Sequence, residues 1–243
     1  MGSEVLMQTV IRHVMKCDLI LSSGFLAFAR HVGVLRALER REIEVDGICG
    51  TSSGALVGSM WANGVATDVL AERLAAQTPM SMMRLHRRPW LGLFEMDAVI
   101  DQLREWLPPR FEDLPRPFGV GVATRDGKAR VLRSGPLPEA VAASCAIPVV
   151  FAPVAICDLQ YVDGGTVDRT ALNAWHEIRG DRRMILHLVD RTGGAKSPET
   201  EIPKSVDVIR TRRSGASFWS LGDFAGQLAE AEQSALMRID AMT

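Results

Sequence analysis

The chain has 243 residues, of which 47% are hydrophobic, so it is long enough to bury one large core and we expect a single domain over residues 1–243. Its 28 basic and 29 acidic side chains nearly cancel, which excludes a general electrostatic attraction to nucleic acid or to an anionic membrane. Any contact with lipid must therefore be local.

Targeting and membrane-spanning signals are the next feature to assess. The N-terminal stretch MGSEVLMQTVIRHVMK has no long apolar run after a basic start, so we expect no secretory signal. The uncharged stretches 47–67 and 140–157 are interrupted by glycines or prolines, and neither is expected to span a membrane. The four cysteines lie in apolar surroundings without CxxC spacing, which favours reduced core thiols and a cytoplasmic location.

Strands and helices are predicted to alternate from the start of the chain. Residues 17–23 form a short apolar run that ends in small residues and predicts a buried strand. Residues 28–43 place apolar side chains at helical spacing beside charged positions, which predicts an amphipathic helix. A second strand is predicted over 45–50, followed by a second helix over 53–64.

The alternation continues in the rest of the chain. The further elements that we predict are helices near 67–77 and 96–106, a hairpin over 118–135, a helix that leads into Cys145, a strand that leads into Asp163, a helix over 169–179, a strand over 183–190 and a C-terminal helical segment over 218–242. This pattern favours an α/β fold in which helices cover both faces of a sheet.

The motif GTSSG lies between the second predicted strand and the second predicted helix. Only Ser52 has a glycine two residues away on each side, at Gly50 and Gly54. A sharp strand-to-helix turn exposes such a serine, and glycines leave room for close chain approach. The helix N-terminus would also favour an oxyanion. Because serine is a preferred helix N-cap, a purely structural role stays open at this point.

A serine nucleophile needs a base within hydrogen-bond reach. None of the histidines lies in a loop that favours this role; they are His13, His31, His86, His176 and His187. Asp163 is a better candidate, because it ends a predicted strand and is followed by Gly164 and Gly165, which let the chain turn. From the residues alone, an ordinary turn aspartate remains the simpler interpretation.

Four segments in this order resemble the patatin-like phospholipase family: LILSSGFLAFARHVGVLRALE, GTSSGALVG, ASCAIPVVFAPV and YVDGG. The resemblance runs from about residue 17 to residue 190. It implies a three-layer α/β/α fold around a mostly parallel sheet, and a serine hydrolase that cleaves acyl esters of lipids. It places the nucleophile on Ser52 and the base on Asp163, in a dyad without histidine. By this resemblance Asp163 takes the proton from Ser52, an acyl-enzyme forms, and water releases the fatty acid.

The loop after the first strand departs from the family's pattern. The family has a glycine-rich loop there, roughly GxGxxG with a basic residue; its glycines fall on Ser23, Phe25 and Phe28, and its basic residue falls on Ala27. Main-chain N–H groups provide the main stabilisation of an oxyanion, so we expect the hole to be formed by Gly24, Phe25 and Ser53. The apolar side chains favour acyl chains or neutral esters over phospholipid head groups.

Two other functional classes stay open. One is an α/β-hydrolase with a Ser-Asp-His triad, whose base would be His176 or His187. The other is a catalytically weak relative that binds lipid or a protein partner, an alternative that the altered loop keeps open. The sequence leaves the natural lipid, any activating partner and the oligomeric state open.

Partners and cofactors can be narrowed from local patterns. Residues 79–94 mix apolar side chains with arginines, which suits the edge of a membrane, although a segment packed over the core with a solvated basic edge is the simpler interpretation. No cluster of His, Cys, Asp or Glu has metal-ligand spacing, and no Walker pattern is present. We therefore expect a lipid or ester substrate and no cofactor, metal or nucleic acid.

Overall fold

A computed structural model describes residues 16–76, 80, 83–88, 90, 92–191 and 201–242. His13 and residues 79, 81, 82, 89 and 91 of the segment 79–94 lie outside the described residues. No helix in the described ranges is both long enough and apolar enough to cross a membrane.

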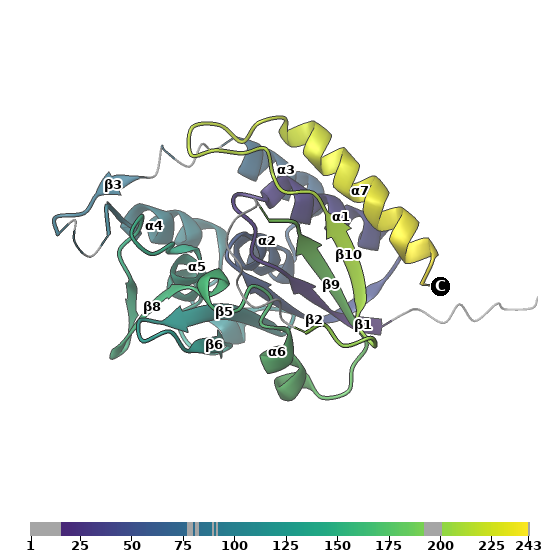
Figure 1. Ribbon diagram of the computed structural model, residues 1–243, viewed down its shortest axis with the longest axis horizontal. Coiled ribbons are helices and arrows are strands. Elements are labelled where there is room, and N and C mark those ends of the chain that lie inside the picture. The colour runs from purple at the N-terminus through teal and green to yellow at the C-terminus, as the bar shows by residue number, and fades with distance from the viewer. Residues whose placement is uncertain are drawn as a thin grey trace, which may run out of the picture.

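The centre of the structure is an eight-stranded sheet (Figure 1). Its strands are β1 (Lys16–Leu21), β2 (Glu44–Thr51), β5 (Phe118–Thr124), β6 (Ala129–Leu132), β7 (Val154–Ile156), β8 (Leu159–Asp163), β9 (Met184–Val189) and β10 (Asp207–Thr211). Strands β10, β9, β1, β2 and β5 pair in parallel in that order, whereas β6, β7 and β8 pair antiparallel. The expectation of a mostly parallel central sheet is confirmed. A separate two-stranded sheet is formed by β3 (Arg84–Leu85) and β4 (Phe94–Glu95).

Helices cover the two faces of the sheet unequally. They are α1 (Phe28–Arg40), α2 (Ser53–Ala62), α3 (Thr67–Ala75), α4 (Asp97–Trp106), α5 (Leu137–Cys145), α6 (Leu172–Arg179) and α7 (Phe224–Asp240). Residues of α6 belong to a small core cluster, and the other six helices contribute to a larger one. Figure 1 shows α6 on one side of the sheet and α1 and α7 on the other. The three layers are therefore present, with most helices in one of them.

The alternation of side chains along the strands explains the two core clusters. On β1, Leu19 and Leu21 belong to the larger cluster and Ile20 to the smaller one. On β2, Ile48 and Cys49 are divided in the same way. Successive side chains of a strand point to opposite faces, so continuous apolar runs such as these are what a sheet covered on both faces requires.

Four strands and the starts of two helices differ from the sequence analysis. Helix α6 begins at Leu172 rather than 169, because the Asp168 carboxylate accepts hydrogen bonds from the N–H groups of Thr170 and Ala171 and holds a turn there. Helix α7 begins at Phe224, where the Asp223 side chain caps it. Strands β3, β4, β7 and β10 were not predicted: the first three have only two or three residues, and β10 (DVIRT) is a short edge strand that carries charged residues.

The cysteines only partly match the expectation of core thiols. Cys17 and Cys49 are buried, whereas Cys145 is half-buried and Cys157 is exposed. Cys157 lies in the turn between β7 and β8, with a positive φ of 51°. The prediction of a core thiol is therefore wrong for Cys157, because the apolar residues around it in the sequence form a surface hairpin.

Candidate active site

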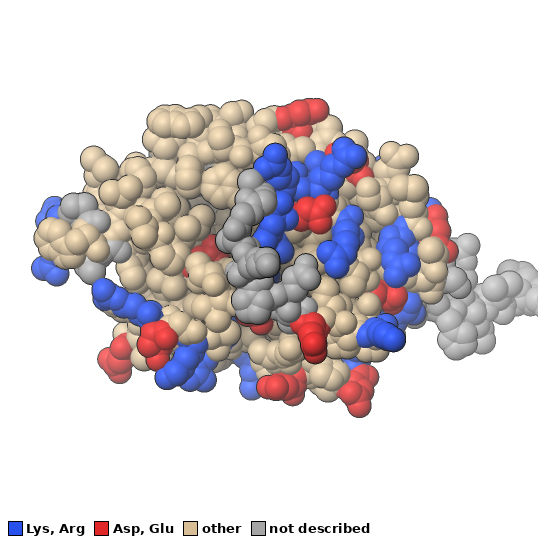
Figure 2. Space-filling model, viewed as in Figure 1, with Lys and Arg blue, Asp and Glu red and all other residues tan. Residues whose placement is uncertain are grey.

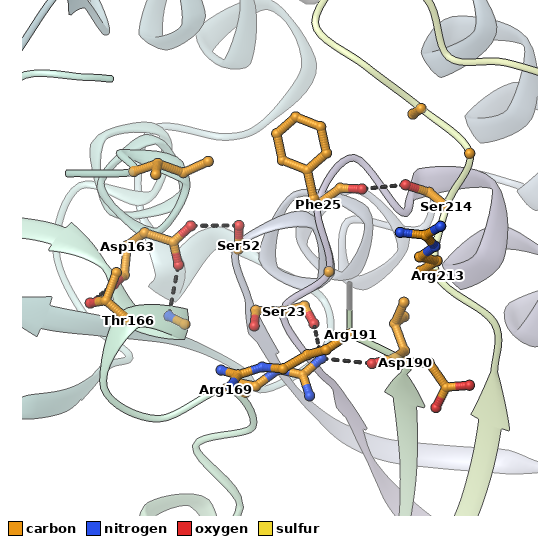
Figure 3. A pocket seen from close by; sticks show the side chains of 16 residues that line it. Ser23, Phe25, Ser52, Asp163, Thr166, Arg169, Asp190, Arg191, Arg213 and Ser214 are labelled. Atoms are coloured by element: carbon orange, nitrogen blue, oxygen red, sulfur yellow. Dashed lines mark hydrogen bonds between the residues drawn. The ribbon is translucent and has the colours of Figure 1, made fainter. Parts of the chain in front are cut away.

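Strand β5 brings Ser52 and Asp163 together through its pairing with two neighbours. Thr51, at the end of β2, pairs with Gly121, and Asp163, at the end of β8, pairs with Val122. Ser52 follows Thr51 directly, so its side chain reaches the aspartate. The Ser52 Oγ lies 2.8 Å from Asp163 Oδ2 (Figure 3). Two residues that are 111 positions apart are thus hydrogen-bonded.

The main chain at Ser52 makes the sharp strand-to-helix turn that the GTSSG motif predicts. Ser52 has φ 55° and ψ −121° and directly precedes α2. Such a conformation costs roughly 1–3 kcal/mol for a residue with a side chain. A Cβ on Gly50 would lie 2.4 Å from the Gly54 oxygen, and a Cβ on Gly54 would lie 2.3 Å from the Leu21 oxygen. Both positions of the motif therefore require glycine.

Helix α5 fixes the main chain of Ser52 from both sides. The Ser52 N–H donates to Ser144 Oγ at 2.8 Å, and that hydroxyl donates to the Gly121 oxygen at 2.6 Å. The Cys145 thiol donates to the Ser52 oxygen at 3.4 Å. Ser144 belongs to the segment ASCAIPVVFAPV, and spacing along the chain gives no signal that it contacts the GTSSG turn. Its position depends on how α5 packs beside β5.

Asp163 lies in a buried setting that changes its acidity. The side chain is 5% exposed, and burial raises its pKa to about 6, while hydrogen bonds from Ser52 and from the Gly165 N–H act in the opposite direction. A Cβ on Gly164 would lie 2.5 Å from the Gly121 oxygen, so glycine lets the chain turn closely there. A carboxylate with a pKa near neutrality is well suited to accept a proton at physiological pH.

Two of the histidines form a buried hydrogen-bonded row beside this site. His31 Nδ1 lies 2.8 Å from His187 Nδ1, His31 Nε2 lies 3.1 Å from Ser53 Oγ, and His187 Nε2 lies 2.8 Å from Thr211 Oγ1. Burial lowers the pKa of His31 to about 3 and that of His187 well below its ordinary value. Both rings are therefore neutral, and all four ring nitrogens are occupied.

The other two described histidines make contacts with residues other than Ser52 and Asp163. His176 is half exposed and lies 3.6 Å from Asp181. His86 Nδ1 accepts a hydrogen bond from the Arg88 N–H at 2.8 Å. In the part of the chain that the structure describes, no histidine is hydrogen-bonded to Ser52, whose hydroxyl partner is Asp163.

The loop that follows β1 lies beside Ser52. Leu26 has a positive φ of 48°, and Ala27 is completely buried at the start of α1. A Cβ on Gly24 would lie 3.0 Å from the Cβ atoms of Ala27 and Val189, so the loop packs tightly. The N–H groups of Gly24 and Phe25 make no hydrogen bond to another described residue. They are available to a ligand.

Comparison with known proteins identifies the family. The sequence model described as patatin-like phospholipase matches residues 19–174. The chain belongs to the patatin-like phospholipase family. It is 34% identical over 190 residues to an uncharacterized NTE family protein of Mycobacterium tuberculosis, an alignment that covers 76% of this chain and 52% of that protein. It therefore spans about half the length of this relative.

Two further similarities agree with this assignment. A patatin-like phospholipase domain-containing protein of Caenorhabditis elegans is 33% identical over 182 residues, which cover 69% of this chain and 13% of that protein. The crystal structure of VipD from Legionella pneumophila matches with a TM-score of 0.59 and 13% identity, over 94% of this chain and 67% of that one. The patatin-like fold expected from the sequence is thus confirmed.

Two cavities meet at Ser52. The larger, of about 560 Å³, is here called the polar cavity, and its lining includes Ser23, Asp163, Arg169, Asp190, Arg191 and Arg213. The smaller, of about 110 Å³, is called the apolar cavity, and its lining includes Leu26, Phe28, Met96, Trp106, Phe151 and Phe218. Ser52 and Phe25 line both. Figure 2 shows Lys and Arg side chains gathered beside a hollow on this face of the molecule.

Sequence reasoning missed the arginines of the polar cavity. Arg191 lies two residues after β9 and Arg213 two residues after β10, at the edge of the sheet where parallel strands end. Arg169 Nη2 donates to the Ser23 oxygen at 3.1 Å and to the Val189 oxygen at 2.6 Å. The position of Arg191 and Arg213 shortly after strands could have identified them as candidate binding residues, because ligands of open α/β sheets bind at the carboxyl ends of the strands.

Proposed function

We propose that the chain is a serine lipid acyl hydrolase, of the phospholipase, lysophospholipase or esterase type, that acts through the dyad of Ser52 and Asp163. The observation that carries the proposal is the 2.8 Å hydrogen bond between a serine in a strained turn and a buried carboxylate. Family membership supports lipid esters as the substrate class.

The proposed reaction begins when Ser52 Oγ attacks the acyl carbonyl carbon and Asp163 accepts the hydroxyl proton. The N–H groups of Gly24, Phe25 and Ser53 would hold the oxyanion that forms. Collapse of this intermediate breaks the ester bond, the departing alcohol takes the proton, and an acyl-enzyme remains. Asp163 then deprotonates a water molecule, which attacks the acyl-enzyme; as the bond from the acyl group to Ser52 Oγ breaks, Asp163 returns the proton to this oxygen and the fatty acid is released.

We propose that the apolar cavity holds the acyl chain. It contacts Ser52 and Ser53 on one side and is lined mainly by aromatic and aliphatic groups. Phe25, Leu26 and Phe28, which stand near the family's glycine positions, contribute to this lining. Burial of each methylene contributes about 0.8 kcal/mol, so such a cavity favours an acyl group over a short polar one.

We also propose that the whole chain is a single domain. Helix α7 packs along α1, where a Cβ on Gly33 would lie 2.3 Å from the Leu228 oxygen. Arg41, directly after α1, donates two hydrogen bonds of 2.6 and 2.7 Å to Asp240, the last residue of α7. Because α7 contributes to the larger core cluster, we expect its removal to expose the core rather than to release a separate unit.

Residues 79–94 are proposed to contact the lipid surface. Leu85 and Trp90 are 78% and 77% exposed. The Leu93 N–H donates to the Val149 oxygen at 3.1 Å, so the exposed Val149 side chain lies beside this segment. Exposed apolar groups beside cations suit the boundary of a bilayer. The cations described in this segment are Arg84, Arg87 and Arg88.

Liposome flotation tests this contact. A double variant, Leu85→Ser with Trp90→Ser, is expected to reduce the fraction of protein bound to vesicles of anionic and zwitterionic phospholipid at least about fivefold, because two apolar groups are lost. Ile178→Ser is the matched control, since Ile178 is an exposed apolar residue of α6, outside the segment 79–94. Equal binding of the double variant and the wild type would contradict the proposal.

The experiment that separates the dyad from a histidine triad uses His176→Ala and His187→Gln. Both variants are expected to keep kcat/KM for a short-chain ester within about tenfold of the wild type, because neither ring is bonded to Ser52. Glutamine at 187 retains hydrogen-bonding groups in the buried row. A loss of about a thousandfold in either variant, with an unchanged unfolding midpoint, would favour the triad.

A further inference from the structure

The loop after β1 carries a hydroxyl group at a position where the family's pattern has glycine. The residue is Ser23, which lines the polar cavity together with Ser52 and Asp163. Figure 3 shows Ser23 between Ser52 and Arg169. A glycine has no side chain to contribute to a reaction, whereas a serine brings a hydrogen-bond donor and acceptor to the same place. The active site of this chain therefore contains a polar group that the family's pattern does not supply.

The Ser23 hydroxyl is free to bind a small molecule in the cavity. Three other hydroxyl groups line this cavity in the described part of the chain, those of Ser52, Thr166 and Ser214, and each donates a hydrogen bond to another residue. Ser23 Oγ, by contrast, makes no hydrogen bond to another described residue. Its hydrogen-bonding capacity is thus open to the cavity, next to the reacting groups.

The position of Ser23 is fixed by its main chain and not by its hydroxyl group. The Ser23 N–H donates to the Arg169 oxygen at 2.7 Å, and the Ser23 oxygen accepts from Arg169 Nη2 at 3.1 Å. The preceding Ser22 holds the loop against β9, because its N–H donates to the His187 oxygen and its hydroxyl accepts from the Val189 N–H, both at 3.0 Å. Loss of the Ser23 hydroxyl leaves all of these bonds in place.

Gly165 makes room for the Ser23 side chain next to Asp163. A Cβ on Gly165 would lie 2.6 Å from Ser23 Oγ and 3.0 Å from Asp163 Oδ1. The hydroxyl oxygen and the carboxylate oxygen therefore lie close to one common point. Two oxygens in this arrangement are near enough to hydrogen-bond the same water molecule.

Deacylation is the part of the proposed reaction that needs such a water molecule. The acyl chain occupies the apolar cavity, and departure of the alcohol leaves the polar cavity, of about 560 Å³, open to water. In the acyl-enzyme Ser52 Oγ carries no proton, so the Asp163 carboxylate can accept a hydrogen bond from water instead. A water held by one bond can turn about it, whereas a second bond directs a lone pair at the acyl carbonyl carbon.

We propose that the Ser23 hydroxyl holds the water molecule that hydrolyses the acyl-enzyme, so that Ser23 is a catalytic residue of deacylation and not of acylation. This inference rests on the proposed hydrolase function. The water donates one hydrogen bond to Asp163 and one to Ser23 Oγ, and its oxygen attacks the acyl carbonyl carbon as Asp163 takes the proton. The bond to Ser52 Oγ then breaks and this oxygen receives the proton from Asp163. Ser23 itself neither gains nor loses a proton.

Ser23→Ala and Ser23→Gly test the proposal with 4-nitrophenyl butyrate, because this ester allows the two half-reactions to be measured separately. The value of kcat/KM reports acylation, which ends with the release of nitrophenolate. The deacylation rate constant is the turnover per acylated enzyme, and intact-mass spectrometry after an acid quench gives the acylated fraction. Both variants should lower the deacylation rate constant about tenfold, because one hydrogen bond to the water is lost, and should keep kcat/KM within about twofold of the wild type.

Ser22→Ala is the matched control, since it removes a buried hydroxyl that is bonded to β9. It should lower the unfolding midpoint and leave the ratio of the deacylation rate constant to kcat/KM as in the wild type. Equal losses in both half-reactions of the Ser23 variants, no loss in either, or a loss in Ser23→Gly without one in Ser23→Ala would overturn the role of the hydroxyl and leave the hydrolase intact. A folded wild type that forms no acyl-enzyme on Ser52 would contradict the proposed function, and this inference with it.

Discussion

Replacing Ser52 with alanine is expected to lower kcat for ester hydrolysis by at least about 10⁴-fold, because the variant has no group that can form the acyl-enzyme. Turnover of a chromogenic ester and of a lipid ester at saturating concentration measures the effect. The unfolding midpoint should stay close to that of the wild type, since alanine fits the same turn and loses only the hydrogen bond to Asp163.

The neighbouring serine provides the matched control. In Ser53→Ala the N–H group is retained and only the contact of the hydroxyl with His31 Nε2 is lost. We expect this variant to keep kcat within about tenfold of the wild type. If instead Ser53→Ala were inactive and Ser52→Ala active, the assignment of the two serines would be reversed.

Replacing Asp163 with asparagine is the second change with a large expected effect. The amide cannot accept the serine proton, so kcat/KM should fall at least about 10⁴-fold above about pH 6, and the difference from the wild type should narrow at lower pH, where Asp163 is protonated as well. In the wild type, kcat/KM should fall about tenfold for each pH unit below about 6, because burial raises the pKa of Asp163 to about 6 and only the ionised form accepts the proton. The pH profiles of both proteins measure this.

The same substitution should not weaken the fold at neutral pH. With a folded pKa of about 6 against an ordinary value of 3.8, Asp163 binds more protons in the native state in this interval, so its contribution to the free energy of unfolding falls as pH rises from about 4 to about 6. Ionisation then costs about 3 kcal/mol above pH 6, and Asp163→Asn avoids this cost. Urea unfolding at about pH 4 and about pH 8 should show that the stability of Asp163→Asn relative to the wild type rises by about 3 kcal/mol across this interval, because groups common to both proteins, such as the buried His31 and His187, cancel in the comparison. A variant that is much less stable than the wild type at both pH values would contradict this explanation.

The sequence predicts the two ends of the dyad because each lies in a local pattern. A strand, a GxSxG turn and a helix identify Ser52, and a strand followed by two glycines identifies Asp163. Their contact, however, depends on the register of β5 with β2 and β8, which no local pattern contains. The pairing of Ser52 with Asp163 was predicted from the resemblance to the family.

The parts of the site that the sequence did not reveal depend on distant packing. Ser144 reaches the Ser52 N–H from 92 positions away, and Arg213 enters the polar cavity through β10, an edge strand with a weak pattern. His31 of α1 and His187 of β9, which form the buried hydrogen-bonded row, are likewise 156 positions apart. The contacts of Ser144, His31 and His187 are set by helix and strand packing, so spacing along the chain carries no signal for them, whereas Arg213 could have been found only if β10 had been predicted.

Labelling with a fluorophosphonate probe, followed by mass-spectrometric mapping of the modified peptide, tests the central claim most directly. The dyad predicts that the folded wild type, His176→Ala and His187→Gln are labelled on Ser52, and that Asp163→Asn is labelled much more slowly. Ser52→Ala should not react. Labelling of another residue, or a folded wild type that does not react, would contradict the assignment of Ser52 as the nucleophile.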